Sequence, residues 1–167
     1  MLENLLKQEL CSMGADLVGF SKLPTSPIKN QPNLIYAVTI AIKLPDAVLK
    51  TIEERPTIEY FHTYRTVNAL LDRIAFLGAR IIEKQGYNAF PIPASQSTAD
   101  DKSAYRGVFS HKMGARLSGL GFIGKNGLFI SEEFGSKIRL ATILTDMEVI
   151  PERPLVESKC KGCTICQ

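Results

Sequence analysis

The chain has 167 residues, of which 45% are hydrophobic and 22% are charged, and its formal net charge is +3. This length suits one compact domain with a core of its own, and the composition excludes disordered and collagen-like proteins. The longest nearly apolar run, residues 34–44, is about half of the ~20 residues that a membrane span needs. Charged side chains among the first ten residues exclude a signal-peptide core. The sequence contains no block of five like charges, so its charge pattern does not support nucleic-acid binding. We therefore expect a soluble, cytoplasmic protein without a membrane partner.

The N-terminal part predicts one helix and two strands. Leucine residues at helical spacing predict a helix over 2–13, with Gly14 as its stop and Cys11 on it as a small buried side chain. The apolar segments 15–23 and 34–42 predict strands. The second is short and rich in β-branched residues, so we expect it at the centre of a sheet.

The remaining elements alternate between helix and strand and then end on two strands. In order, the pattern predicts a short helix from Pro45 toward Glu54, a long helix from Pro56 to a left-handed cap at Gly86, a strand at 87–92, a polar loop at 94–103, a helix at 108–117, and strands at 128–130 and 138–144. The last two strands have the spacing of a hairpin. This order predicts an α/β (α+β) fold with a mixed sheet flanked by helices. His62, beside Tyr60 and Tyr64, is expected to be structural.

The glycine segment 119–126 imitates two nucleotide-binding motifs. Gly119, Gly121 and Gly124 satisfy G-x-G-x-x-G, and Lys125 extends a match to the first seven positions of G-x-x-x-x-G-K-[ST]. Both motifs need a strand before the glycines and a helix after them, whereas the predicted order here is reversed. Asn126 also lacks the hydroxyl that binds magnesium. Two interpretations remain: a helix-to-strand turn, or a turn whose backbone closely approaches a bulky ligand.

Three cysteines crowd the C-terminal end of the sequence. Cys160, Cys163 and Cys166 match the first three ligands of the C-x₂-C-x₂-C-x₃-C-P run that binds a [4Fe–4S] cluster, and Gly162 lets the backbone curl. A zinc site is an alternative that requires a second, more distant pair of ligands. A flexible tail with chance cysteines is the third interpretation.

The fourth cluster ligand is absent from the sequence, because the chain stops at Gln167. We expect this chain to be a fragment of a longer protein in which an iron–sulfur domain follows. The predicted boundaries are 1–155 for the α/β domain and 156–167 for the start of a ferredoxin-like domain. With three thiolates, the fragment alone is expected to hold no normal cluster and to be inactive.

Taken together, the C-terminal motifs resemble the epoxyqueuosine reductase family and its iron–sulfur relatives. The resemblance covers residues 105–167 and rests on an ordered set of motifs: Ser110-His111-Lys112, Gly-Leu-Gly-Phe-Ile-Gly-Lys-Asn-Gly-Leu at 119–128, Phe134-Gly135-Ser136, Leu140-Ala141-Thr142, Leu144-Thr145-Asp146 and the cysteine run. It implies a nitroreductase-like domain that binds cobalamin, followed by a domain with two [4Fe–4S] clusters. Electrons then pass from an electron donor such as ferredoxin or flavodoxin, through the clusters, to cobalt. The implied reaction removes the epoxide oxygen of epoxyqueuosine in tRNA, and reductive dehalogenases use a related arrangement.

The sequence departs from this family at four positions. Phe122 stands where the family has tryptophan, and Tyr105 stands where the family has the aspartate that donates a proton. His111-Lys112 replaces a Glu-Arg pair. These differences predict a different substrate pocket and weigh against a tRNA substrate. Tyr105 remains a candidate proton donor, because a phenol with a pKa near ~10 stays protonated at neutral pH.

Four further side chains are candidates for contact with a corrinoid. His111 is expected to hydrogen-bond a corrinoid amide or to donate a proton, and the alternative is a helix-start histidine held by the protein. Lys112, Lys125 and Asn126 offer cations and an amide to the corrinoid side chains, as do the backbones of Gly119, Gly121 and Gly124. For Lys125 and Asn126 the alternative is a solvated surface.

The leading functional hypothesis is the cobalamin-binding portion of an iron–sulfur-dependent reductase. The cofactor carries the difficult chemistry in such a protein, and the chain supplies position and protons. A non-catalytic electron-transfer or corrinoid-activation protein, a reductive-dehalogenase-like enzyme and a flavin-binding α/β domain are the competing hypotheses.

Overall fold

The structure is a computed structural model that describes residues 2–96 and 107–166. Its elements, in chain order, are α1 (Leu2–Ser12), β1 (Leu17–Lys22), β2 (Tyr36–Lys43), α2 (Asp46–Leu49), α3 (Ile58–Lys84), β3 (Ala89–Ile92), α4 (His111–Leu117), β4 (Gly121–Ile123), β5 (Phe129–Ser131) and β6 (Ile138–Thr145). Among these described residues, no helix is both long and apolar enough to cross a membrane.

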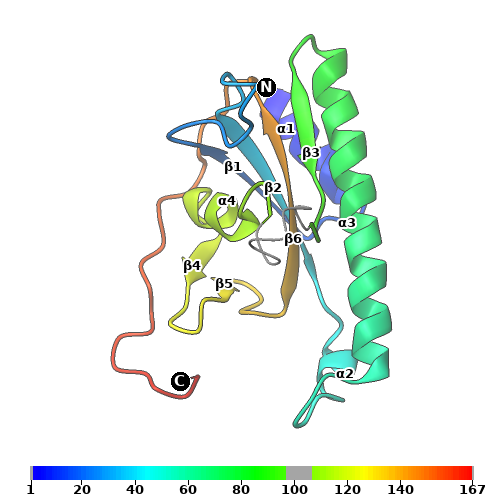
Figure 1. Cartoon of the computed structure of the whole chain (residues 1–167), viewed down its shortest axis with the longest axis vertical. Helices are drawn as coiled ribbons and strands as arrows, with labels where there is room; N and C mark the ends of the chain where they lie inside the picture. Colours follow the sequence, from blue (N-terminus) through cyan, green and yellow to red (C-terminus); the bar gives the residue numbers. More distant parts are fainter. Residues whose placement is uncertain (1, 97–106, 167) are drawn as a thin grey trace.

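A four-stranded sheet forms the centre of the molecule (Figure 1). Its strand order is β1-β2-β6-β3, and each of the pairings is antiparallel. The predicted α/β arrangement of a sheet flanked by helices is confirmed, but the described sheet is antiparallel rather than mixed, since both β2 and β6 run against their neighbours. The predicted pairing of the last two strands is wrong, because β5 pairs with β4 in a separate hairpin while β6 inserts beside β2. β6 has the burial of a central strand, since seven of its eight residues are buried.

One face of the sheet is covered by α1 and α3. Val38, Ile40 and Ile143 alternate along the strands and pack against Leu10 of α1 and Ile74 of α3 in one continuous apolar core. These side chains are almost fully buried, so each contributes roughly 1.5–3 kcal/mol of transfer free energy to folding. This face therefore holds the largest of the apolar clusters among the described residues.

The N-terminal helix departs from prediction at Cys11. The side chain is exposed, so the predicted small buried hydrophobe is wrong. The reason is angular: Leu6 and Leu10 form the buried stripe of α1, and a residue one step beyond Leu10 points about 100° away from it.

Two predicted helices are shorter than expected. α2 covers only Asp46–Leu49, and α4 starts at His111 rather than at residue 108. By contrast, the long helix ends where predicted, and Gly86 has the left-handed backbone (φ +88°) of a C-terminal cap.

The opposite face of the sheet is covered by α4 and the β4–β5 hairpin (Figure 1). α4 crosses three strands and approaches each of them closely. His111 hydrogen-bonds Thr142 of β6. A Cβ on Gly114 would lie 2.5 Å from Thr39 Oγ1 of β2, and one on Gly19 of β1 would lie 2.5 Å from Ser118 Oγ at the end of α4. Small residues thus let this helix lie close to the sheet.

Candidate functional site

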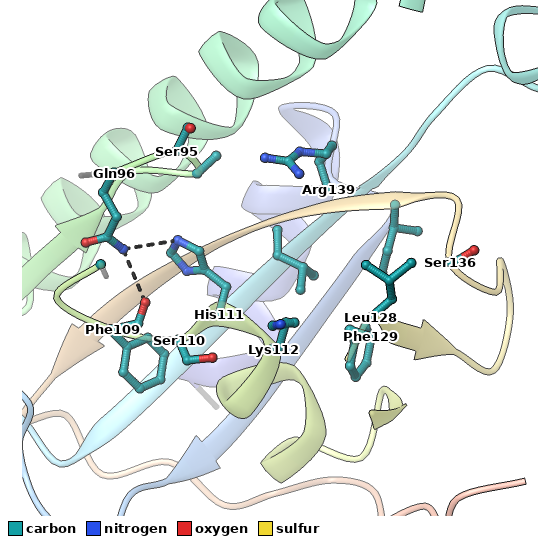
Figure 2. Close-up of a pocket in the computed structure, with 14 residues that line it drawn as sticks. Ser95, Gln96, Phe109, Ser110, His111, Lys112, Leu128, Phe129, Ser136 and Arg139 are labelled. Atoms are coloured by element: carbon teal, nitrogen blue, oxygen red, sulfur yellow. Dashed lines mark hydrogen bonds between the residues drawn. The ribbon is translucent and has the colours of Figure 1, made fainter. Parts of the chain in front are cut away.

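A cavity of about 660 Å³ opens between α4, the hairpin and the free edge of β6. β3 pairs with β6 only over Thr142–Thr145, so the first half of β6 forms a sheet edge within the described part of the chain. Figure 2 shows the side chains around this opening. The lining residues are Ala94, Ser95, Gln96, Gly107, Phe109, Ser110, His111, Lys112, Leu128, Phe129, Ser136, Ile138, Arg139 and Leu140. Two of them are cationic and none of these fourteen is acidic, so the described wall favours an anionic or carbonyl-rich ligand.

His111 stands at the inner wall of this cavity, and both ring nitrogens have protein partners. Nε2 lies 2.8 Å from the carbonyl oxygen of Pro93, which can only accept, so Nε2 carries the hydrogen. Nδ1 lies 2.9 Å from Thr142 Oγ1 and accepts the hydroxyl hydrogen when the ring is neutral. Burial lowers the pKa of His111 below its ordinary value of 6.5, and the charge of Arg139 acts in the same direction. The ring is therefore a neutral bridge between α4, β6 and the segment after β3.

The same segment is held at two more points. Gln96 accepts a hydrogen bond from Val108 N at 2.8 Å, and its amide nitrogen donates to Phe109 O at 3.2 Å (Figure 2). Asp72 of α3 accepts from Ala94 N at 2.7 Å. These contacts fix the described ends of the stretch that separates β3 from α4.

Arg139, at the edge of β6, is the second cation of the cavity wall after Lys112. Its Nε donates to Asn68 Oδ1 at 3.0 Å, and Nη2 donates to the hydroxyl of Tyr64 at 3.1 Å, with the guanidinium 4.2 Å from the centre of that ring. The Tyr64 hydroxyl also lies 3.4 Å from Ser95 Oγ. The pKa of Tyr64 lies below its ordinary value of 10.0, chiefly because of the Ser95 contact, with Asn68 and Arg139 adding to the effect.

Sequence reasoning did not identify Tyr64 or Arg139 as site residues. One sequence signal was available for Arg139, since it is the single charged residue in the apolar strand Ile138–Thr145. Tyr64 lies 75 residues away on α3, and only the fold brings the two side chains together.

The predicted corrinoid contacts fall into two groups. His111 and Lys112 line the cavity, and Lys112 Nζ also donates to Gly127 O at 2.8 Å. Lys125 and Asn126 are absent from this lining and meet the chain's own atoms: Lys125 Nζ donates to Cys163 O at 3.0 Å, and Asn126 Oδ1 accepts from Leu128 N at 3.1 Å. Their assignment to a cofactor stays a prediction.

The glycine segment follows α4 and contains β4, so the predicted helix-then-strand order is confirmed, although β4 itself was missed. A Cβ on Gly121 would lie 2.1 Å from Ile130 O of the partner strand, and one on Gly124 would lie 2.8 Å from Ile130 Cδ1. Gly119 has a left-handed φ of +71°, and a Cβ there would lie 2.6 Å from Pro154 O. Packing within the chain therefore explains these three glycines without a ligand.

The three clustered cysteines lie on an irregular tail. Cys160 is half-buried, Cys163 and Cys166 are exposed, and Gly162 has the left-handed φ of +72° that the predicted curl requires. Among residues 2–96 and 107–166, no three His, Cys, Asp or Glu side chains gather closely enough to hold a metal ion. The thiols are accessible and closely spaced in sequence, which fits a cluster that draws them together when it binds. Tyr105, the candidate proton donor, lies outside the described residues.

The curated relatives of this chain are reductases. An epoxyqueuosine reductase of Bacillus cereus is 33% identical over 138 residues, which cover 79% of this chain and 33% of the relative. The expected resemblance to epoxyqueuosine reductases is confirmed. The chain spans about a third of that relative's length, and no protein-family model matches it.

Solved structures agree on the fold. An epoxyqueuosine reductase crystallised with an epoxyqueuosine-modified tRNA stem loop has a TM-score of 0.66 at 19% identity, covering 97% of this chain and 49% of that one. A reductive dehalogenase studied for B12-dependent dehalogenation has a TM-score of 0.69 at 18% identity, covering 90% and 22%. The fold of this chain is thus similar to the folds of an epoxyqueuosine reductase and of a reductive dehalogenase.

Proposed function

We propose that this chain is the cobalamin-binding part of an iron–sulfur-dependent reductase related to the epoxyqueuosine reductases. The observation that carries the proposal is the position of the β4–β5 hairpin. Leu128 and Phe129 of this hairpin line the cavity beside α4, while Lys125, in the turn of the same hairpin, holds the cysteine tail. A cofactor in the cavity and a cluster on the tail are then neighbours across one thin two-stranded wall.

The cavity has donors suited to the amide-rich rim of a corrinoid. The ammonium of Lys112 donates one hydrogen to Gly127 O, which leaves two hydrogens for a ligand. The guanidinium of Arg139 has five N–H groups, and two of them donate to Asn68 and Tyr64. Cobalamin, when bound, supplies a cobalt centre that accepts electrons and reduces the substrate. The chain's own contribution is to bind and orient it and to hold protons nearby.

His111 in this proposal is a positioning residue rather than a ligand of cobalt. Pro93 O and Thr142 Oγ1 already occupy its two nitrogens, and a neutral ring in this place holds the cavity wall at the edge of β6. The proton for reduction is assigned to Tyr105, the residue at the family's proton-donor position.

The organisation proposed for the whole protein follows the predicted boundaries. Residues 1–155 contain all the helices and strands that the structure describes, and the segment from 156 onward starts the iron–sulfur domain. Epoxyqueuosine in tRNA is the first substrate to test, because the B. cereus relative carries that activity in its name. An electron donor such as ferredoxin or flavodoxin completes the proposal.

The test uses the whole gene product, expressed without oxygen and incubated with hydroxocobalamin before desalting. Wild-type protein is expected to retain corrinoid absorption together with a broad iron–sulfur shoulder. The double variant Lys112→Met/Arg139→Met is expected to lose most of the corrinoid. Arg80→Met, an exposed position of α3 outside the cavity lining, is the matched control. Iron–sulfur absorption without retained corrinoid in the wild type would overturn the cobalamin assignment.

A second measurement separates an enzyme from a carrier. Conversion of epoxyqueuosine-containing tRNA by wild-type protein and by Tyr105→Phe is compared under the same reductant. Loss of turnover with retained corrinoid supports Tyr105 as the proton donor. Unchanged turnover removes it from the mechanism, and no turnover by the wild type favours a corrinoid-activation protein.

A further inference from the structure

The C-terminal tail, residues 150–166, is fastened to the β4–β5 hairpin and the segment beside it. Arg153 pairs with Glu133 at 3.2 Å, and Lys159 pairs with Glu132 at 2.5 Å. The third contact is the hydrogen bond from Lys125 Nζ to Cys163 O. The first two are exposed ion pairs, which contribute little each. The third is the one that reaches the cysteine motif itself.

The turn that carries Lys125 is braced from its other side. Gly124 N donates to Leu128 O at 2.8 Å, and the Asn126 side chain caps Leu128 N, so the turn is closed by its own hydrogen bonds. Lys112 of α4 holds the carbonyl of Gly127. A lysine on such a fixed turn presents its ammonium at a defined place.

A second cavity, of about 720 Å³, lies between the hairpin and the tail. Cys160 lines it, together with three cations, Arg116, Lys125 and Lys161, and one carboxylate, Glu157. Glu157 is paired with Lys161 at 3.3 Å, which leaves the wall with an excess of positive charge next to the first cysteine. An anionic occupant fits this wall, and a metal cluster held by thiolates is anionic.

We propose that Lys125 is the positioning residue of the cysteine segment. It holds the loop around Cys163 against the hairpin before any metal binds, and its charge then favours the reduced, more negative state of the bound cluster. The effect of the Lys125 charge on the cluster rests on the iron–sulfur part of the proposed function, whereas the role of Lys125 in holding the tail does not. The Lys125 charge favours the reduced cluster because an added electron on the cluster is attracted by a fixed cation a short distance away.

The first experiment measures tail release in the whole gene product, reduced and free of metal. Cleavage by glutamyl endopeptidase after Glu157 is followed by mass spectrometry, since a tail that leaves the hairpin enters the protease site more readily than one held against it. Lys125→Met is expected to be cut severalfold faster than wild type, and Lys125→Arg at the wild-type rate because a guanidinium also donates to a carbonyl. Lys84→Met, an exposed position at the end of α3, is the charge-matched control. Equal cleavage of Lys125→Met and wild type overturns the proposal.

The second experiment measures the reduction potential of the cluster after anaerobic reconstitution with iron and sulfide. The one-electron couple is titrated with dithionite and followed by EPR spectroscopy. Lys125→Met is expected to shift the midpoint potential to more negative values, with Lys125→Arg and Lys84→Met unchanged. An unshifted midpoint in Lys125→Met overturns the electrostatic role. Wild-type protein that takes up no cluster overturns that role together with the iron–sulfur part of the proposed function, and the cleavage rates still decide whether Lys125 holds the tail.

Discussion

The two faces of the central sheet are built on different principles. The face toward α1 and α3 carries large side chains such as Phe20, Ile40 and Ile143, which fill an apolar core. The face toward α4 has Gly19 and Thr39 where the helix crosses, so the helix lies close to the sheet. A smaller apolar cluster with Leu17 and Leu140 and one cavity lie beside this crossing. The first face is filled by large side chains throughout, whereas the second combines a smaller apolar cluster with small and hydroxylated residues that give room and hydrogen-bonding groups. The same strands serve both purposes because successive side chains alternate between faces.

The largest effect is expected on the apolar face. Ile143→Ala removes a fully buried side chain from β6, and cavity formation there costs about 2–5 kcal/mol of the free energy of unfolding. Urea denaturation measures this loss. Corrinoid retention by the folded fraction is expected to stay at the wild-type level, because α4 lies on the other face. Loss of retention in protein that is still folded would contradict the division between the two faces.

A smaller loss of stability with a larger loss of binding is expected from Gly114→Ala. The new methyl would lie 2.5 Å from Thr39 Oγ1, so α4 must move away from the sheet, at a cost of about 1–3 kcal/mol. Corrinoid retention should fall because the helix carries His111 and Lys112. Within the described structure Thr39 Oγ1 is buried without a hydrogen-bond partner, so Thr39→Ala should cost little free energy of unfolding and remove the atom that the new methyl would meet. The double variant Gly114→Ala/Thr39→Ala is expected to recover retention, and a failure to recover it would contradict this explanation.

His111 tests the polar face through pH. Since burial lowers its pKa in the folded state below 6.5, the unfolded chain binds a proton more readily, and wild-type stability should fall as the pH drops below about 6.5. His111→Phe leaves Pro93 O and Thr142 Oγ1 without their partner and costs about 1–3 kcal/mol at pH 8. The variant should also lose the pH dependence. Thermal unfolding from pH 5 to pH 8 measures both effects, and His62→Gln, at an exposed position of α3, should behave as wild type. A profile of His111→Phe that still falls below pH 6.5 would assign the titration elsewhere.

The apolar face could be predicted from sequence, and much of the polar face could not. Helical spacing located α1 and α3, and apolar β-branched runs located β2 and β6, because burial on one side imposes a period. β4 was missed because Gly121 is needed to let Ile130 O approach, and glycine gives no strand signal. Motif resemblance found His111 and Lys112 at the cavity, whereas Arg139 and Tyr64 meet only through the fold. Residues that act by tertiary contact leave no periodic trace in a single sequence.

The smallest effect on stability is expected at the end of the sheet near α2, away from both the apolar core and the cavity. Asp46, at the start of α2, pairs with Lys43 of β2 at 2.6 Å and with Lys137, just before β6, at 2.9 Å. Hydrogen bonds from these two lysines lower the pKa of Asp46 from 3.8 to about 2. A lowered carboxylate pKa means that the stabilisation is present above pH 4 and is lost as the pH falls from about 4 to about 2. Asp46→Asn should therefore lower the melting temperature slightly at pH 7 and by clearly less at pH 2, where about half of the carboxylates are protonated, with corrinoid retention intact. Because the carboxylate is exposed to solvent, 1 M salt should remove most of the difference at pH 7, and a difference that survives salt would mean that Asp46 acts through packing rather than charge.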